Sequence, residues 1–470
     1  MSSPISINPR ARSVALIVGG AFFMVLLDTA IITTSLPRMA QSFDVAPVAL
    51  SIGLSIYLVS VAAFVPLAGW LSDRFGARRV FLSSIILFSL ASLACGMAQT
   101  LPAFMAARAF QGLAGALMTP IGRVLVLNHT QKSELVQAMA LITWPALTAP
   151  VIAPALGGFI TTYFSWRWNF LINLPLGVIA FCLSLKFIPA VAPGVRRRFD
   201  LRGFLLSGGA LVGLLLGLES SAHQWIGRTQ AFGLVMLGAV LTVLAVRHLR
   251  SADEPLLSLK PFSIPTFFMA SLLAGLWVRA GINATPFLLP LMLQLVYGFT
   301  PLAAGTYLLV YFLGNLGMKS VSTATLRLFG FRTVIVVNGV LCGLFIMAIA
   351  FFPPEGTPPF LLVVLLLSGL TRSLQYSALN TLALADISGP LNSSAATLTS
   401  MLMQVSMVLG IALSALILAV GHSLTQSPQP VLLNFQVAFV LMGLLVAAAS
   451  LVCLRLPRDA GAEVSGHREP

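Results

Sequence analysis

Long runs of apolar residues are the feature that most constrains the fold of this 470-residue chain. A helix needs about 20 apolar residues to cross the hydrocarbon core of a bilayer. Fourteen runs reach that length, separated by short polar segments. They lie near 13–36, 48–71, 79–99, 101–127, 136–160, 168–188, 201–219, 229–249, 264–295, 300–323, 331–352, 357–381, 395–421 and 432–455. The sequence therefore predicts an all-α polytopic membrane protein with 14 transmembrane helices.

The composition excludes a water-soluble protein. Hydrophobic residues make up 58% of the chain and charged residues 9%, which is too little polar surface for a soluble domain. The net charge of +14 resides in short loops, so we expect no nucleic-acid partner. The four cysteines lie singly in apolar runs, which predicts neither a metal site nor disulfides. Without a Walker loop or a nucleophile elbow, the sequence also predicts no enzyme.

The distribution of Lys and Arg predicts the orientation of the chain, because cytoplasmic loops carry an excess of these residues. One face has only Arg38, Arg167 and Arg228, whereas 20 cations fall on the other face. The larger set is Arg10, Arg12, Arg74, Arg78, Arg79, Lys132, Lys186, Arg196, Arg197, Arg198, Arg202, Arg247, Arg250, Lys260, Lys319, Arg327, Arg332, Arg455, Arg458 and Arg468. An even number of spans with this bias places both termini in the cytoplasm.

A short repeat indicates two related halves. Phe-Gly-Ala-Arg-Arg-Val at 75–80 recurs in altered form as Phe-Gly-Phe-Arg-Thr-Val at 329–334. The two stretches follow corresponding runs if the seventh and eighth runs are set aside as an insert. We therefore predict a six-helix bundle over 1–190, a two-helix insert with its linkers over 191–260, a second six-helix bundle over 261–456 and a cytoplasmic tail over 457–470. Chance similarity between two glycine turns is the alternative.

A polar island separates the second and third runs. It reads Gly-Trp-Leu-Ser-Asp-Arg-Phe-Gly-Ala-Arg-Arg from 69 to 79, and its charges place it at a membrane face. Its glycines allow a tight turn between closely packed helices. The island resembles the signature loop of the major facilitator superfamily, Gly-x-x-x-Asp-Arg-x-Gly-x-Arg-Arg. The resemblance implies the major facilitator fold and a cytoplasmic latch between the two halves, made by Gly69, Asp73, Arg74, Gly76, Arg78 and Arg79.

Of the 13 acids, only Asp28 lies well inside a predicted span. A carboxyl group is costly to ionise at that depth, which favours the reversible protonation that a proton carrier needs. The stretch from Leu27 to Pro37 resembles the first-helix motif of the drug:proton antiporters with fourteen transmembrane helices, in which the acid is assigned to proton coupling. A structural carboxylate held by neighbouring hydroxyl groups is the alternative.

Arg108 and Gln111 form a polar pair in the fourth run. Their spacing places them on one face of a helix, and the glycines that follow let another helix approach. The stretch resembles the Arg-x-x-Gln-Gly motif of the superfamily, in which the arginine is proposed to assist proton transfer. At about 1.5 Å per residue, Arg108 and Asp28 reach similar depths, so contact between them is permitted. A purely structural arginine is the alternative.

Pro154, Gly157 and Gly158 lie in the fifth run, in Ala-Pro-Ala-Leu-Gly-Gly from 153 to 158. A proline and a glycine pair predict a kinked, closely packed helix. The stretch resembles the Gly-Pro-x-x-Gly-Gly motif that tends to separate antiporters from symporters, with Ala153 replacing the first glycine. Three further stretches, at 118–123, 166–175 and 371–373, are similar to the fourteen-helix branch, which includes multidrug-resistance proteins of enteric bacteria.

Cations outnumber acids inside the runs, where Arg108, Arg123, Arg279 and Arg372 stand against Asp28. A cavity for lipophilic cations would be expected to offer carboxylates and aromatic rings. We therefore hypothesise that Arg279 and Arg372 help to bind an anionic, zwitterionic or chelate substrate, with bracing of helices as the alternative. The other cavity candidates are Gln111, Asn283, Gln294, Asn380 and Gln404.

Together these features predict a proton-coupled efflux antiporter of a bacterial inner membrane that works by alternating access. The proton gradient would drive export without a cofactor. We expect a monomer whose partners are protons, a small-molecule substrate and membrane lipids. The nearest alternative is a dedicated exporter of an organic anion or of a metal chelate such as citrate. An uptake symporter and a non-transporting membrane sensor are the remaining alternatives.

Overall fold

The structure is a computed structural model that describes residues 8–131, 134–189, 198–223, 227–252, 254–351, 359–387, 391–425 and 431–465. In these ranges the regular structure is helical, and no strand occurs. Four cations used to predict the orientation, Lys132, Arg196, Arg197 and Arg468, lie outside the described residues.

Fourteen helical segments of the described chain are long and apolar enough to cross a membrane, which confirms the predicted number. They contain α1 (Pro9–Ile31), α3 (Ser51–Phe75), α4 (Ala77–Met97), α5 (Leu101–His129), α6 (Leu135–Tyr163), α7 (Trp168–Leu171) with α8 (Asn173–Phe187), α9 (Leu201–His223), α10 (Arg228–Ser251), α11 (Pro265–Phe268) with α12 (Gly275–Leu295), α13 (Pro301–Gly317), α14 (Ser322–Ile349), α15 (Pro359–Ala385), α16 (Asn392–Thr425) and α17 (Leu432–Leu451). The short helices α2 (Leu36–Phe43) and α18 (Ala462–Ser465) lie outside the spans.

The eleventh span differs most from its predicted range. The prediction begins at 331, whereas α14 begins at Ser322, because the chain stays helical on both sides of a bend at Gly330. Gly330 has a φ of +70° and Gly76, between α3 and α4, has a φ of +88°. Glycine adopts such angles without the steric penalty of other residues. The two copies of the repeat therefore make similar glycine turns.

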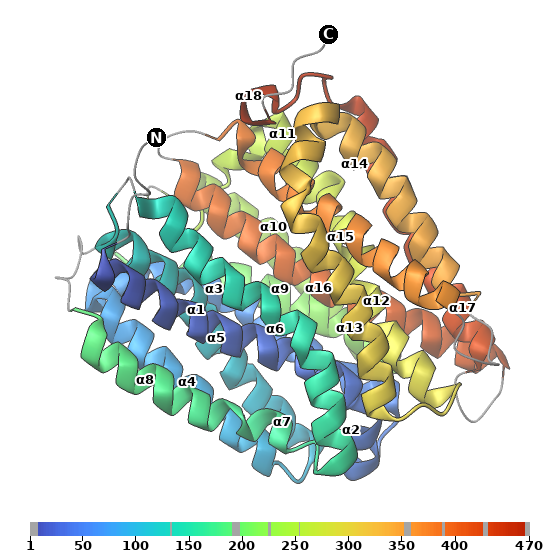
Figure 1. Cartoon of the computed structure of the whole chain (residues 1–470). Helices are drawn as coiled ribbons and strands as arrows, with labels where there is room; N and C mark the ends of the chain where they lie inside the picture. Colours follow the sequence, from blue (N-terminus) through green and yellow to red (C-terminus); the bar gives the residue numbers. More distant parts are fainter. Residues whose placement is uncertain are drawn as a thin grey trace.

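Two groups of helices form the body of the molecule (Figure 1). One group contains α1 and α3 to α8, the other contains α12 to α17, and the groups diverge toward the side where both termini lie. We call this side the Gly76 end, because it holds the turn between α3 and α4. The opposite side, where α6 turns into α7, is called the Trp166 end.

The predicted insert lies along the seam between the two groups. Its helices α9 and α10 pack against each other, and α9 also packs against α3 of the first group and α16 of the second. Aromatic pairs reinforce the contact with α3, since the ring centroids of Phe64 and Phe204 are 5.5 Å apart and those of Trp70 and Phe199 are 4.7 Å apart.

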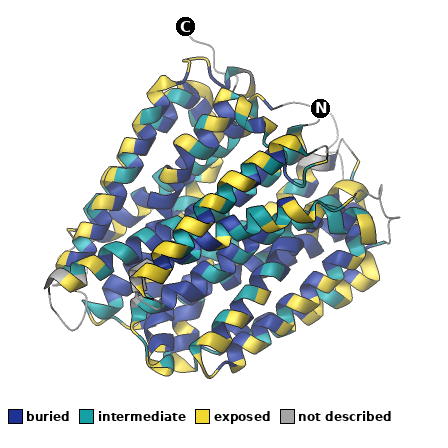
Figure 2. Ribbon diagram, turned by 180° about the vertical axis from the view of Figure 1, so that it is seen from behind, coloured by how far each residue is buried: buried dark blue, intermediate teal, exposed yellow. Residues whose placement is uncertain are grey.

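Buried side chains concentrate where helices face one another, and exposed side chains cover the outward faces (Figure 2). Many of the exposed side chains are large and apolar, among them Leu90, Phe110 and Phe232. Water-soluble monomers rarely expose so much apolar surface, whereas lipid tails cover such a surface without penalty. The chain is therefore a multi-pass membrane protein.

Candidate functional site

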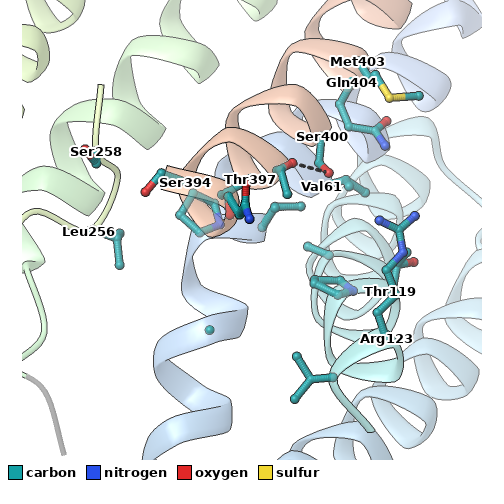
Figure 3. Close-up of a pocket in the computed structure, with 18 of the residues that line it drawn as sticks. Val61, Thr119, Arg123, Leu256, Ser258, Ser394, Thr397, Ser400, Met403 and Gln404 are labelled. Carbon is teal, nitrogen blue, oxygen red and sulfur yellow. Dashed lines mark hydrogen bonds between the residues drawn. The ribbon is translucent and has the colours of Figure 1, made fainter. Parts of the chain in front are cut away.

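A cavity of about 2330 Å³ lies between the two groups of helices. Side chains from α3 and α5 form one wall, and side chains from α16 and the segment 256–258 form another (Figure 3). The lining continues to the Gly76 end, where most of its charged residues lie: Asp73, Arg198, Asp200, Arg250, Glu254 and Lys260.

The Trp166 end of the cavity is closed by contacts between the two groups. Gln294 on α12 donates from Nε2 to the carbonyl oxygen of Thr34 at 3.0 Å, and the amide of Leu302 on α13 donates to Thr162 Oγ1 on α6 at 3.3 Å. The lining of the cavity therefore reaches the Gly76 end, and contacts between the two helix groups close the Trp166 end.

Asp28 on α1 is completely buried and forms the centre of a polar network. Arg108 Nη1 on α5 lies 2.7 Å from its Oδ2, which makes a buried ion pair. Its Oδ1 accepts hydrogen bonds of 2.8 Å from Gln111 Nε2 and from Asn173 Nδ2 on α8. Ser92 on α4 joins the network by accepting from Gln111 at 2.7 Å. The contact between Asp28 and Arg108 that the sequence permitted is present.

Other contacts hold Arg108 independently of Asp28. Its Nε donates to the carbonyl oxygen of Gly53 at 3.1 Å, and its guanidinium carbon lies 4.3 Å from the ring centroid of Tyr57. Tyr57 and Thr29, which follows Asp28, both line the large cavity. A change in the charge of Asp28 would therefore act on groups that touch the cavity.

Two members of the Asp28 network, Ser92 and Asn173, were missed from the sequence. Asn173 lies in the stretch 166–175, which resembles the fourteen-helix branch but received no role there. An asparagine inside a predicted span is itself an indication, because polar side chains within a span need partners. Only the packing of α8 against α1 and α4 identifies the partners.

Gln111 was predicted to line the substrate cavity, but the structure places it in the Asp28 network. Its side chain is completely buried and is not part of the cavity lining. The reason is its position on the face of α5 that contacts α1 and α4.

Two of the remaining candidates, Asn380 and Gln404, line the cavity. Arg279 is completely buried and donates to Asn380 Oδ1 at 3.0 Å and to the carbonyl oxygen of Ala270 at 3.3 Å. Residues Met269–Leu273 form a π-helical turn, so Arg279 caps an irregular part of the backbone one side chain away from the cavity.

The last three candidates lie outside the cavity lining in this arrangement. Asn283 accepts a hydrogen bond of 2.8 Å from the hydroxyl of Tyr376, and Gln294 belongs to the closed Trp166 end. Arg372 lies among three aromatic rings, at 5.2 Å from the centroids of Phe312 and Tyr376 and 5.6 Å from that of Tyr311.

Arg123 on α5, which the sequence analysis counted only as an interior cation, lines the cavity (Figure 3). Within the described residues it makes no ion pair with an acid. The acidic side chains of the lining are Asp73 and those on the linkers of the insert. They lie nearer the Gly76 end than Arg123 does. Arg123 therefore brings a positive charge to the part of the cavity away from these acids.

The 153–158 stretch lies at the closed Trp166 end. A Cβ atom added to Gly158 would lie 2.8 Å from Leu302 Cα of α13, and one added to Gly157 would lie 2.7 Å from a side-chain carbon of Ile31 on α1. Pro154 accepts from Thr34 Oγ1 through its carbonyl oxygen at 3.4 Å. The stretch therefore packs against α1 and against the second group of helices.

The polar island at 69–79 forms the turn of the Gly76 end. Arg78 donates to the carbonyl oxygen of Leu185 at 2.7 Å, and the guanidinium of Arg74 lies 5.6 Å from the ring centroid of Trp70. Asp73 and Gly69 line the cavity. The expected close helix approach does not occur at Gly69, because a Cβ atom there would meet nothing within 4 Å.

A second buried acid, Glu219 on α9, was missed by the sequence analysis. It is completely buried and accepts hydrogen bonds from the hydroxyls of Ser51 and Ser55 on α3, the latter at 3.0 Å. Its position as the last residue of its predicted run concealed it. The serine pair, four residues apart at the start of the second span, would have indicated a polar face there.

Asp200, at the Gly76 end of the cavity, is held in its charged form. Burial acts to raise its pKa, but hydrogen bonds from the Gly203 amide, His248 Nε2 and the Leu256 amide outweigh this effect and hold the pKa below its usual range. These bonds join both linkers of the insert to the start of α9 and the end of α10. In the described part of the chain, no group of three His, Cys, Asp or Glu side chains could hold a metal ion.

Comparison with known proteins identifies the family. Residues 18–411 match the family model described as "Major Facilitator Superfamily". The chain is 36% identical over 455 residues, 94% of each chain, to the protein named "Putative multidrug resistance protein MdtD" of Escherichia fergusonii, and equally similar to its counterpart in Escherichia coli O139:H28.

Solved structures show the same fold at low sequence identity. The inward-open xylose transporter XylE of E. coli matches with a TM-score of 0.64 and 12% identity, over 96% of this chain and 98% of that chain. The POT family transporter PepTSo matches with a TM-score of 0.68 and 14% identity, over 98% and 99%. The chain is therefore a transporter for small molecules and not an enzyme, and it belongs to the major facilitator superfamily.

Proposed function

We propose that this chain is a proton-coupled efflux antiporter of a bacterial inner membrane, with the Gly76 end and both termini in the cytoplasm. The excess of Lys and Arg in the loops of that end supports the orientation. The name of the MdtD relatives supports export of drugs or similar small molecules. We further propose that the protein acts as a monomer among membrane lipids, and that the proton gradient drives it without a cofactor.

The observation that carries this proposal is the position of Asp28. It is a completely buried carboxylate within a predicted span, and it is paired with Arg108 beside the wall of the large cavity. Intramembrane acids in such positions serve proton relays. Protonation would remove the charge that Arg108 pairs with, while Gly53 and Tyr57 would still hold the guanidinium in place.

In the proposed cycle, a proton from outside binds Asp28 with the help of Arg108. The neutral acid lets the protein return to the arrangement seen here, in which the cavity is lined out to the Gly76 end. Substrate then enters from the cytoplasm. The proton leaves inward from this same arrangement. The opposite arrangement then releases the substrate outward.

The test follows the internal pH of proteoliposomes under an imposed proton gradient. Candidate cationic drugs are added first, then organic anions such as citrate with and without iron. We expect substrate-dependent proton movement in the wild type and in the exposed-site control Asp459→Asn, and none in Asp28→Asn. Full gradient-driven transport by Asp28→Asn would overturn the assignment of the proton site.

The second candidate function is dedicated export of an organic anion or a metal chelate. Arg123 favours it, because this cation lines the cavity without an acidic partner in the described chain. We expect Arg123→Gln to raise the KM for anionic substrates by roughly tenfold, the scale of one charge-assisted contact, and to leave neutral substrates unaffected. Arg279→Ala and Arg372→Ala test the two arginines that lie outside the lining, and Arg458→Gln is the charge-matched control.

A further inference from the structure

A smaller cavity of about 380 Å³ lies at the Trp166 end, away from the transport cavity. It is lined by α2, by the end of α6 and by the turn that follows α6. The lining residues are Arg38, Gln41, Ser42, Thr161, Thr162, Phe164, Ser165, Trp166 and Arg167. No Asp or Glu is among them.

The two arginines of this cavity have hydrogen-bond donors to spare. Arg38 is exposed, and Arg167 is held by one hydrogen bond of 3.0 Å from Nη2 to the carbonyl oxygen of Ala98 and by the ring of Trp166, whose centroid lies 4.4 Å from the guanidinium carbon. A guanidinium carries five N–H donors and no acceptor. These two contacts hold the Arg167 side chain in place, and the hydrogen bond uses only one of its five N–H donors.

Hydroxyl groups add further donors. Thr162 Oγ1 accepts from the amide of Leu302 at 3.3 Å, and Ser165 Oγ accepts from the amide of Arg167 at 3.4 Å. A hydroxyl that accepts a hydrogen bond still has its own proton to donate. The lining therefore combines two positive charges with hydroxyl donors.

Cations are also concentrated here relative to the rest of this end. The loops of the Trp166 end contain only three Lys or Arg residues, Arg38, Arg167 and Arg228, and two of these line one small cavity. Surface cations that bind no ligand would not need to line the same cavity. This convergence, without an acid to neutralise it in the lining, indicates a negatively charged ligand.

We propose that this cavity binds a small oxyanion, a phosphate or carboxylate group, held by Arg38 and Arg167. Planar guanidinium groups recognise such oxyanions through paired hydrogen bonds, and hydroxyl donors complete the set. The ligand is either a free anion or the phosphate of a lipid headgroup in the adjacent leaflet. It would touch Thr162, which also contacts Leu302 of the other helix group, so it sits against the closed end.

The first arm of the test measures binding of inorganic phosphate. Full-length protein in phosphatidylcholine nanodiscs is titrated with phosphate by isothermal calorimetry, at an ionic strength fixed with chloride. We expect wild type and the Arg458→Gln control to bind, and Arg38→Gln to bind roughly tenfold more weakly, since it loses one charge-assisted contact. Ser165→Ala, which keeps both charges, is expected to show a smaller loss. Arg38 is exposed, so its replacement leaves the fold intact.

The second arm measures lipid retention. Protein purified from mixed phosphatidylglycerol and phosphatidylcholine membranes is analysed by native mass spectrometry, and retained phosphatidylglycerol is compared between wild type and Arg38→Gln. Arg38-dependent phosphate binding identifies a free oxyanion as the ligand. Arg38-dependent retention of phosphatidylglycerol without phosphate binding identifies a headgroup. If neither is detected, or if both are the same in Arg38→Gln, the proposal is overturned.

Discussion

At the scale of single residues, the buried pair of Asp28 and Arg108 combines two requirements that conflict. A charge buried in a spanning segment needs partners, and Asp28 has three donors around its two oxygen atoms. The proposed role as a proton carrier also requires an uncharged state of the acid, and then Arg108 would lose its partner. Its contacts with Gly53 and Tyr57 provide the remaining support, which makes both states of the acid structurally tolerable.

Replacing Arg108 with Lys tests whether this geometry matters beyond charge. Lysine keeps the charge but lacks the planar fork that reaches Gly53, Asp28 and Gln111 together. We expect Arg108→Lys to fold normally and to lose substrate-driven proton transport by roughly tenfold or more. Proteoliposome pH measurements check this, with the thermal melting profile as the control for folding. Wild-type transport in Arg108→Lys would show that a point charge is sufficient.

At the scale of helices, small residues and buried polar pairs decide which elements approach one another. Gly158 lets α6 pack directly on the start of α13, and Glu219 bonds the insert helix α9 to α3. In a membrane the hydrophobic effect does not drive helices together, because lipid tails are also apolar. Close packing and hydrogen bonds therefore contribute most of the free energy of helix association. These contacts therefore determine how the helix groups and the insert are joined.

Gly158→Leu should prevent closure of the Trp166 end, because even a Cβ atom would lie 2.8 Å from Leu302 Cα. We expect loss of transport and a longer distance between spin labels at exposed positions 38 and 300, in a background where the exposed Cys182 is replaced by Ser. Gly233→Leu on α10 is the matched control, since a Cβ atom there meets nothing within 4 Å. An unchanged label distance in Gly158→Leu would contradict this role.

Glu219→Leu should weaken the attachment of the insert. It removes the acceptor of two buried serine hydroxyls, and each buried group left unsatisfied costs about 1–3 kcal/mol. We expect the melting temperature to fall by several degrees. Glu219→Gln, which keeps one acceptor oxygen, should fall between this variant and wild type. Equal melting temperatures for all three would show that the hydrogen bonds do not stabilise the insert.

At the scale of the whole molecule, the two helix groups meet at the Trp166 end and diverge toward the Gly76 end (Figure 1). We propose that they are the two bundles expected over 1–190 and 261–456, with the insert over 191–260 and a tail over 457–470. The insert contacts both bundles through α9, so it follows the seam along which they would rock. The proposed latch at 69–79 lies at the diverged end, where Asp73 lines the cavity.

A disulfide across the closed end would trap this arrangement. Thr162 Oγ1 and the Leu302 amide are 3.3 Å apart, so the two residues are in contact across the closed end. We expect Thr162→Cys with Leu302→Cys to lose transport on oxidation and to regain it on reduction. Each single variant should transport under both conditions. Transport by the oxidised double variant, with the disulfide verified by mass spectrometry, would show that this end need not open.

Much of the fold was predictable because the bilayer imposes a simple rule on the sequence. All fourteen spans, the glycine turns of the repeat and the depth match of Asp28 and Arg108 follow from hydropathy, helix rise and a few motifs. The candidate site was predicted less well. Gln111 lies in the Asp28 network instead of the cavity, Arg279 caps a π-helical turn, and Glu219 is a buried acid that its position at the edge of a run concealed.

The sequence by itself determined that the chain crosses a membrane fourteen times, and it indicated that Asp28 and Arg108 lie inside it. Apolar length and charge depth are properties of single segments, so they can be read along one dimension. Tertiary structure alone decided which side chains meet: Asn173 reaches Asp28 from 145 residues away, and Arg123 faces the cavity while Arg279 does not. The rotation of each helix about its axis sets these outcomes, and it depends on packing against neighbours that are distant in sequence.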